Sequence, residues 1–72
     1  QDWAVTGEIS LSGDIKPVGG VYEKAFGARQ AGMKGIFIPY ENRTDIGEAH
    51  LSLSVTPVRH IKEILDFMLV KK

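Results

Sequence analysis

The fold is decided by residues 19–39, which read GGVYEKAFGARQAGMKGIFIP. The glycine pair at its start interrupts the extended segment before it, and residues 21–31 then carry apolar side chains at the spacing of an amphipathic helix. Gly32 is a typical helix stop, and residues 35–39 are apolar without a break, as in a central strand buried on both faces. A strand, a helix and a second strand at this spacing predict a right-handed βαβ crossover.

The residues before this stretch predict a β-hairpin. Residues 5–11 alternate between apolar and polar, which is the period of a half-buried strand, with Thr6 on its polar side. Residues 12–14, Ser-Gly-Asp, supply turn chemistry. Residues 15–18 can then return as the second strand, in which Pro17 indicates an edge position or the end of the strand.

The residues after the central stretch predict a strand and a final helix. Residues 40–49 are polar and indicate a loop or a short helix, whereas residues 51–55 alternate leucine or valine with serine, as a half-buried strand does. Thr56 is then the predicted N-cap of the last helix, and Pro57 its first residue. The apolar stripe of this helix is predicted to consist of Val58, Ile61, Ile64, Leu65 and Met68.

The predicted class is therefore α/β: a β-hairpin followed by a βαβ unit, a further strand and a C-terminal amphipathic helix. We expect the helices to pack on one side of the sheet. No repeat or linker divides the chain, so residues 1–72 are predicted to form one unit. A chain of this size buries only about 60% of its unfolded surface and usually needs a disulfide, a metal or a protein partner.

Composition excludes several classes of function. The chain has no Cys, so disulfides and thiolate metal sites are excluded, and His50 and His60 cannot complete a zinc site by themselves. The formal net charge of +0 gives no basic footprint for nucleic acid or anionic lipid, and the longest apolar run, residues 67–70, is too short to span a membrane. We expect no metal or cofactor in this chain, no nucleic-acid partner and no membrane contact. Because the chain starts with Gln1 rather than Met, we expect it to lie within a longer polypeptide.

One lysine is a candidate for chemistry. On the helical wheel, Lys24 lies at the edge of the apolar arc, between Ala28 and Ala31. One interpretation is structural: the methylenes pack on the helix and the ammonium reaches water. The other is chemical, because the helix dipole disfavours a cation in the first turn and small neighbours allow partial desolvation, so that both favour the neutral amine. A neutral lysine amine can act as the general base for a serine hydroxyl.

Several ordered blocks of the chain resemble one known family. The blocks are TGEISLSG at 6–13, PVGGVYEK at 17–24, AG at 31–32, IFIP at 36–39, EN at 41–42 and VTPV at 55–58. They resemble the C-terminal half of the proteolytic domain of Lon proteases, which are ATP-dependent AAA+ proteases with a Ser-Lys catalytic dyad. The resemblance covers roughly residues 4–69 and implies a partial Lon proteolytic domain with a ribosomal protein S5 domain 2-like fold.

The resemblance implies roles for individual residues. The family's catalytic lysine ends its Gly-Gly-x-x-x-Lys block, which falls on Lys24. The threonine of its Thr-Gly-Glu block falls on Thr6, which implies that this hydroxyl hydrogen-bonds the lysine amine and orients it. Glu8 of the same block is expected near the site, although an exposed strand carboxylate is the simpler interpretation. The stretch after Asn42 is shorter than in typical members, which affects only a surface connection.

The nucleophilic serine of the family has no counterpart in this chain. In the family it lies upstream, in a Pro-x-Asp-Gly-Pro-Ser-Ala-Gly type of segment, and Ser10, Ser12, Ser52 and Ser54 lack that context. We therefore interpret these four serines as structural. The serine-bearing half of the same domain becomes an expected partner, together with protein or peptide substrates, and these 72 residues alone are not expected to be active.

The resemblance further implies an attached AAA+ module that uses ATP and Mg²⁺, a hexameric homo-oligomer, and an intracellular, cytoplasmic location with a role in protein quality control. A second hypothesis is a catalytically inactive Lon-like module that serves packing, oligomerisation or partner binding. A third is a free-standing binding protein, which would require the chain to fold alone as a monomer.

Overall fold

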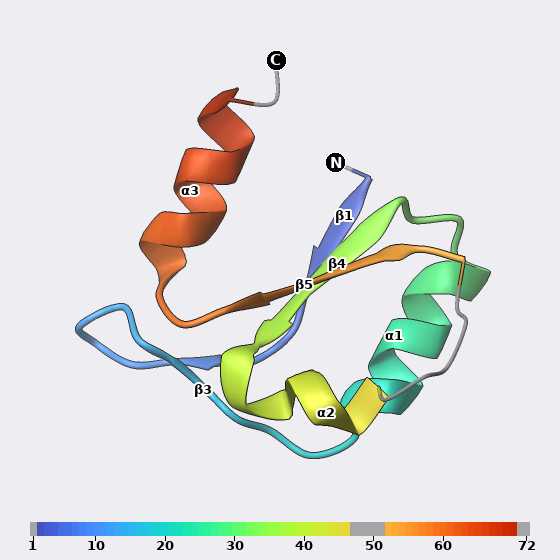
Figure 1. The fold of residues 1–72 in the computed structure, drawn as a ribbon, viewed down its shortest axis with the longest axis horizontal. Helices are drawn as coiled ribbons and strands as arrows, with labels where there is room; N and C mark the ends of the chain where they lie inside the picture. Colours follow the sequence, from blue (N-terminus) through green and yellow to red (C-terminus); the bar gives the residue numbers. More distant parts are fainter. Residues whose placement is uncertain (1, 47–51, 71–72) are drawn as a thin grey trace.

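The chain is described by a computed structural model that covers residues 2–46 and 52–70. A parallel sheet, a small antiparallel hairpin and helices make up the described part (Figure 1), so the predicted α/β class is confirmed. In chain order the elements are β1 (Trp3–Val5), β2 (Glu8–Ile9), β3 (Ile15–Lys16), α1 (Val21–Gln30), β4 (Gly35–Pro39), the 3-10 helix η1 (Tyr40–Asn42), α2 (Arg43–Ile46), β5 (Ser54–Val58) and α3 (Ile61–Val70).

The predicted central strand is confirmed. β4 lies between β1 and β5 and is parallel to both, with Ile36 opposite Ala4 on one side and opposite Val55 on the other. All five residues of β4 are buried. A strand that is covered on both faces needs apolar side chains at every position, which is why its sequence shows no alternation.

The two faces of β4 carry two separate parts of the core. Ile36 and Ile38 pack with the buried face of α1, whereas Phe37 packs with Ile64 of α3. Figure 1 shows the sheet lying between α1 and α3. Our expectation that the helices pack on one side of the sheet is therefore wrong, because successive side chains of a strand point to opposite faces and β4 has large apolar residues on both.

The strand that we predicted over residues 5–11 is divided in two. β1 ends at Val5 and belongs to the parallel sheet, whereas β2 starts at Glu8 and pairs antiparallel with β3. Between them Gly7 has a φ of +137°, a conformation that strongly favours glycine. The hairpin is thus confirmed, but it stands outside the parallel sheet, and the strand that precedes α1 in the crossover to β4 is β1 rather than residues 15–18.

The start of the last helix differs from the prediction. Thr56 and Pro57 belong to β5, opposite Phe37 and Ile38 of β4, so the predicted N-cap and first helical position are wrong. β5 is an edge strand of the described sheet, and an edge strand accommodates proline because one side of it needs no ladder hydrogen bond. The helix begins instead at Ile61.

A cap formed by His60 and Glu63 replaces the predicted one. The Glu63 carboxylate accepts hydrogen bonds from the backbone N–H groups of Arg59 and of His60, the latter at 3.0 Å. His60 Nδ1 accepts from the N–H of Lys62 at 3.1 Å, and His60 Nε2 lies 2.8 Å from the carbonyl oxygen of Ser12. This is the reciprocal arrangement of a capping box, with histidine in the place usually taken by serine or threonine.

The apolar stripes that we predicted are only partly buried. Ile64 of α3 is in the core, but Val58, which we predicted in the same helical stripe, is buried at the end of β5 instead. Leu65 and Met68 of α3 are exposed, as are Tyr22 and Phe26 of α1. Phe67 takes the inward position on α3 and packs against the rings of Trp3 and Phe37, with centroid distances of 4.7 and 5.2 Å. Leu51 and His50, which we also discussed, lie outside the described residues.

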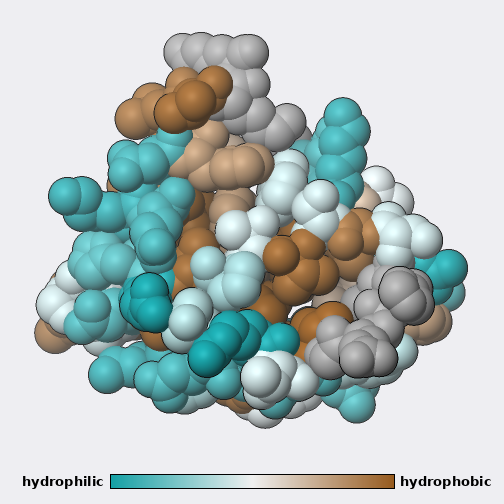
Figure 2. All heavy atoms as spheres, viewed as in Figure 1, coloured by the Kyte–Doolittle hydropathy of each residue, from teal (hydrophilic) through white to brown (hydrophobic). Residues whose placement is uncertain are grey.

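Part of the surface of the molecule is made of exposed apolar side chains. Figure 2 shows apolar side chains at the upper end of α3 and across the centre of the face of the molecule that is turned to the viewer. Leu69 and Val70 contribute to this exposed surface on α3. Within residues 2–46 and 52–70, no helix combines the length and the apolar character that crossing a membrane requires.

Candidate active site

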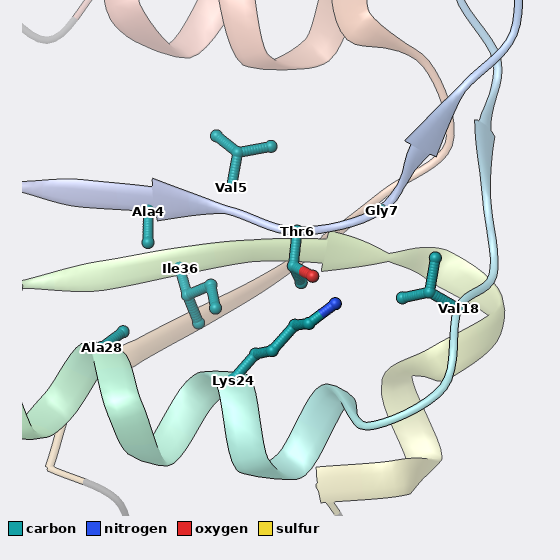
Figure 3. A pocket seen from close by; sticks show the side chains of 8 residues that line it. All are labelled: Ala4, Val5, Thr6, Gly7, Val18, Lys24, Ala28 and Ile36. Atoms are coloured by element: carbon teal, nitrogen blue, oxygen red, sulfur yellow. The ribbon is translucent and has the colours of Figure 1, made fainter.

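A pocket of about 430 Å³ opens where β1 ends beside α1 (Figure 3). It is lined by Ala4, Val5, Thr6, Gly7, Val18, Lys24, Ala28 and Ile36. These residues come from β1 and the residues after it, from the segment before α1, from α1 itself and from β4. The two predicted site residues, Lys24 and Thr6, are therefore brought to one pocket.

Lys24 reaches the pocket from the first turn of α1. The helix starts after Gly20, whose φ is +69°, and the backbone N–H of Lys24 donates to the Gly20 carbonyl at 3.1 Å. The inner face of the helix is anchored by Val21 and Ala25, both fully buried. Lys24 is exposed as a residue, but its side chain extends toward β1, so that its amine points toward the hydroxyl oxygen of Thr6 in Figure 3.

Thr6 reaches the same pocket from the end of β1. Its backbone N–H donates to the carbonyl of Phe37 at 3.0 Å, which extends the pairing of β1 with β4 by one residue. Thr6 is only 7% exposed, whereas Val5 is 49% exposed. The sequence alternation predicted the opposite. Ala4 and Thr6 face α1, which covers them, and Val5 faces the other side of the sheet, where α3 leaves it partly open.

Only two of the residues that line the pocket carry a polar side chain. Of the eight residues that line it, Lys24 is the only ionisable one and Thr6 the only one with a hydroxyl; the others are apolar or glycine. An amine beside a hydroxyl within apolar walls suits proton transfer to or from a reacting group. Among residues 2–46 and 52–70 no group of His, Cys, Asp or Glu is arranged to hold a metal ion.

None of the other polar candidates lines this pocket. The hydroxyl groups of Ser10 and Ser12 lie 3.1 Å apart in the turn between β2 and β3, where Ser12 also donates to Asp14. Ser52 and Ser54 lie before and at the start of β5, on exposed positions. Glu8 is exposed on β2 and does not line the pocket.

Asn42 is a buried polar residue whose structural contacts the sequence did not indicate. Its side-chain amide bonds both backbone groups of Val18, a lining residue of the pocket. The same amide donates to Asp45 at 2.7 Å. One sequence signal could have pointed to Asn42: it follows the end of the fully apolar strand 35–39 by three residues. The end of that strand lies at the edge of the sheet where the pocket forms.

The sequence of this chain matches one family of known proteins. The family model described as the Lon protease (S16) C-terminal proteolytic domain matches residues 1–71. The Lon protease of Buchnera aphidicola subsp. Baizongia pistaciae is 44% identical over 94% of this chain, and Lon protease 2 of Bacillus subtilis is 45% identical over 93% of it. The Lon protease of Escherichia coli strain K12 is 40% identical over 94% of the chain.

The matched part is small relative to these proteins. The chain spans 9% of the length of the Buchnera and Escherichia coli relatives and 12% of the Bacillus protein. Within this chain, the family model covers every residue except the last. The chain therefore belongs to the Lon protease (S16) family, in the C-terminal proteolytic domain.

Proposed function

We propose that this chain is part of a Lon-type serine endopeptidase and contributes Lys24 as the general base of a Ser-Lys dyad. The observation that carries the proposal is the meeting of Lys24 and Thr6 in one otherwise apolar pocket. The family membership supports the same reaction, because the matched relatives are named as Lon proteases.

In the proposed reaction, the neutral amine of Lys24 accepts the proton of a serine hydroxyl as the serine oxygen attacks the carbonyl carbon of a peptide bond. The resulting ammonium returns the proton to the leaving amine, and an acyl-enzyme remains. A water molecule, deprotonated by the same amine, then attacks the ester carbonyl; the bond to the serine oxygen breaks, the ammonium returns the proton to that oxygen, and the new carboxyl terminus is released. Backbone N–H groups near the serine would stabilise the oxyanion in both steps.

Thr6 has a supporting role in this proposal. Its hydroxyl accepts a hydrogen bond from an N–H of the neutral amine and thereby directs the single lone pair of the nitrogen at the serine. The backbone of Thr6 is fixed by the hydrogen bond to Phe37 on the central strand, so the hydroxyl is presented from a rigid position. A base held in one orientation loses little entropy when the reaction starts.

Further parts of the proposal concern the complete protein. We assign the nucleophilic serine to another segment of the same domain, and peptide or protein chains as substrates. An attached AAA+ module would bind ATP and Mg²⁺ and feed unfolded substrate to the site, in a hexamer of identical subunits within the cytoplasm. The proposed biological role is protein quality control.

The test is Lys24→Ala in the complete protein, assayed for peptide hydrolysis and for ATP turnover. We expect peptide hydrolysis to be lost and ATP turnover to be kept. Lys24→Arg should be as inactive as Lys24→Ala, because a guanidinium does not give up its proton at neutral pH. Lys62→Ala, at an exposed position on α3, is the matched control and should remain active.

Two results would count against the proposal. Substantial peptide hydrolysis by Lys24→Ala would show that another group is the base. A complete wild-type protein that hydrolyses no peptide under any condition with ATP would favour the second hypothesis, an inactive Lon-like module that serves packing, oligomerisation or partner binding.

A further inference from the structure

We infer that Asn42 is a positioning residue, which fixes the segment that leads into α1 and thereby places the amine of Lys24. The inference rests on the proposed function, because it concerns the geometry of the group that we assign as the base. Asn42 itself does not line the pocket and is not expected to touch the substrate.

The side-chain amide of Asn42 bonds both the backbone N–H and the backbone carbonyl of Val18, as a residue of a neighbouring strand can. Its Oδ1 accepts from the backbone N–H of Val18 at 3.0 Å, and its Nδ2 donates to the carbonyl oxygen of the same residue at 2.9 Å. The second hydrogen of Nδ2 is donated to Oδ2 of Asp45 at 2.7 Å. Asn42 is 6% exposed, so both donor hydrogens of a buried amide are used and the orientation of the amide is fixed.

Apart from the packing of Val18 against the core cluster with Val21 and Ala25, the clamped segment has few other constraints. Val18 is followed by Gly19 and Gly20, which have no side chains, and α1 begins without a side-chain cap. Within the described residues, every side-chain hydrogen bond to residues 17–20 comes from Asn42. Glycine pairs are conformationally permissive, so the position of this segment depends on the bonds made just before them.

The clamp connects two parts of the structure that matter for the pocket. Asn42 ends η1, which directly follows the buried strand β4, so its backbone is tied to the centre of the sheet. Val18 lies in the wall of the pocket, and Lys24 follows it one helical turn into α1. Loss of the clamp would therefore let the helix start shift relative to Thr6, the residue that follows β1, while leaving the sheet in place.

An amide is chemically specific for this position. A carboxylate of the same shape could accept from the Val18 N–H but could not donate to its carbonyl, and it would place a second negative charge beside Asp45. An apolar side chain would leave both backbone groups of Val18 without a partner in a half-buried site.

The experiment uses the complete protein and measures kcat and KM for peptide hydrolysis together with thermal unfolding. Asn42→Ala should lower kcat roughly tenfold to a hundredfold, because a misplacement of about 1 Å can cost that much. KM should stay within about twofold, since ground-state binding is not altered. Glu63→Ala is the control, because it removes the cap of α3 away from the pocket and should lower Tm with kcat unchanged.

If Asn42→Ala does not fold, the double variant Asn42→Asp/Asp45→Asn decides the question. It keeps an acceptor for the Val18 N–H and a bond between the two side chains, but it has no donor for the Val18 carbonyl. A lowered kcat in this folded variant supports the inference. A kcat equal to that of the wild type in either variant overturns it, because the role of Asn42 would then be structural only.

The outcomes for the inference and for the proposed function are separate. If Lys24→Ala is inactive and Asn42→Ala keeps the wild-type kcat, only the inference fails. If Lys24→Ala is active, the proposed function fails whatever the Asn42 variants do.

Discussion

Lys24 and Thr6 reach the same pocket from two different elements, the first turn of α1 and the residue that follows β1. Neither the helix nor the strand alone brings them together. They meet because β1 pairs with β4 as far as the bond between Thr6 and Phe37, and because Val21 and Ala25 anchor the start of α1 on the same face of the sheet.

Thr6→Val should lower kcat for peptide hydrolysis roughly tenfold to a hundredfold, because it removes a hydrogen bond that is worth about 1.5–3 kcal/mol once the Lys24 amine has taken the serine proton and become charged. Valine has nearly the shape of threonine, so the fold should be kept. Steady-state kinetics of the complete protein measure the effect. Thr6→Ser is the control and should retain most activity, because it keeps a hydroxyl at the same position; equal activity of Thr6→Val and wild type would contradict the proposed role.

Gly7→Ala should destabilise the protein by about 1–3 kcal/mol, because the φ of +137° is unfavourable for any residue with a Cβ. The added Cβ would also lie 2.9 Å from Cγ2 of Ile15 and 3.1 Å from Cγ of Pro39. Denaturant unfolding measures the change. We expect activity to fall as well, because Gly7 follows Thr6 directly.

Gly27→Ala is the matched control for this prediction. Gly27 lies within α1, and a Cβ added there would meet no atom within 4 Å. Alanine is a better helix former than glycine by about 0.5–1 kcal/mol, so this variant should be more stable than wild type. Equal effects of the two glycine substitutions would show that backbone conformation at Gly7 is not what limits stability.

The sequence predicted the local elements well and their packing less well. The helix over residues 21–31, its glycine stop and the buried strand over residues 35–39 are all found, because each depends on short-range periodicity and turn chemistry. The side of the sheet that α3 covers could not be predicted in this way. It depends on Phe37 and Trp3, which contact Phe67 only after the chain has folded back.

In the candidate site, too, local features could be predicted from the sequence and contacts between distant residues could not. Lys24 could be singled out from its place on the helical wheel, and Thr6 from the resemblance. The burial of Thr6 was predicted wrongly, because alternation shows which residues share a face but not which face is covered: Thr6 lies on the face that α1 covers, and Val5 lies on the more open one. Asn42 could not be identified, because its partner Val18 lies far from it in sequence and the bond depends on how β4 places η1.

Gly35→Ala should destabilise the protein by about 1–3 kcal/mol through overpacking. An added Cβ would lie 2.5 Å from Cη2 and Cζ3 of Trp3, which packs in turn on Phe37 with a centroid distance of 4.9 Å. The indole would have to leave its place between β1 and α3. Near-ultraviolet circular dichroism and thermal unfolding measure this change, and an unaltered aromatic signal together with an unaltered Tm would contradict it.

Glu63→Gln should remove an acid-dependent part of the stability. The backbone N–H groups of Arg59 and His60, which donate to the Glu63 carboxylate, hold its pKa below the ordinary value of 4.5. The carboxylate of Glu63 thus binds a proton more weakly in the folded state than in the unfolded state. The stability that the ionised carboxylate contributes is therefore present above pH 4.5 and is lost as the pH falls through the lowered pKa. Tm should therefore be higher for wild type than for Glu63→Gln at neutral pH, and the difference should shrink progressively below pH 4.5. A difference that stays constant from neutral to strongly acidic pH would mean that the shape of the side chain, and not its charge, caps α3.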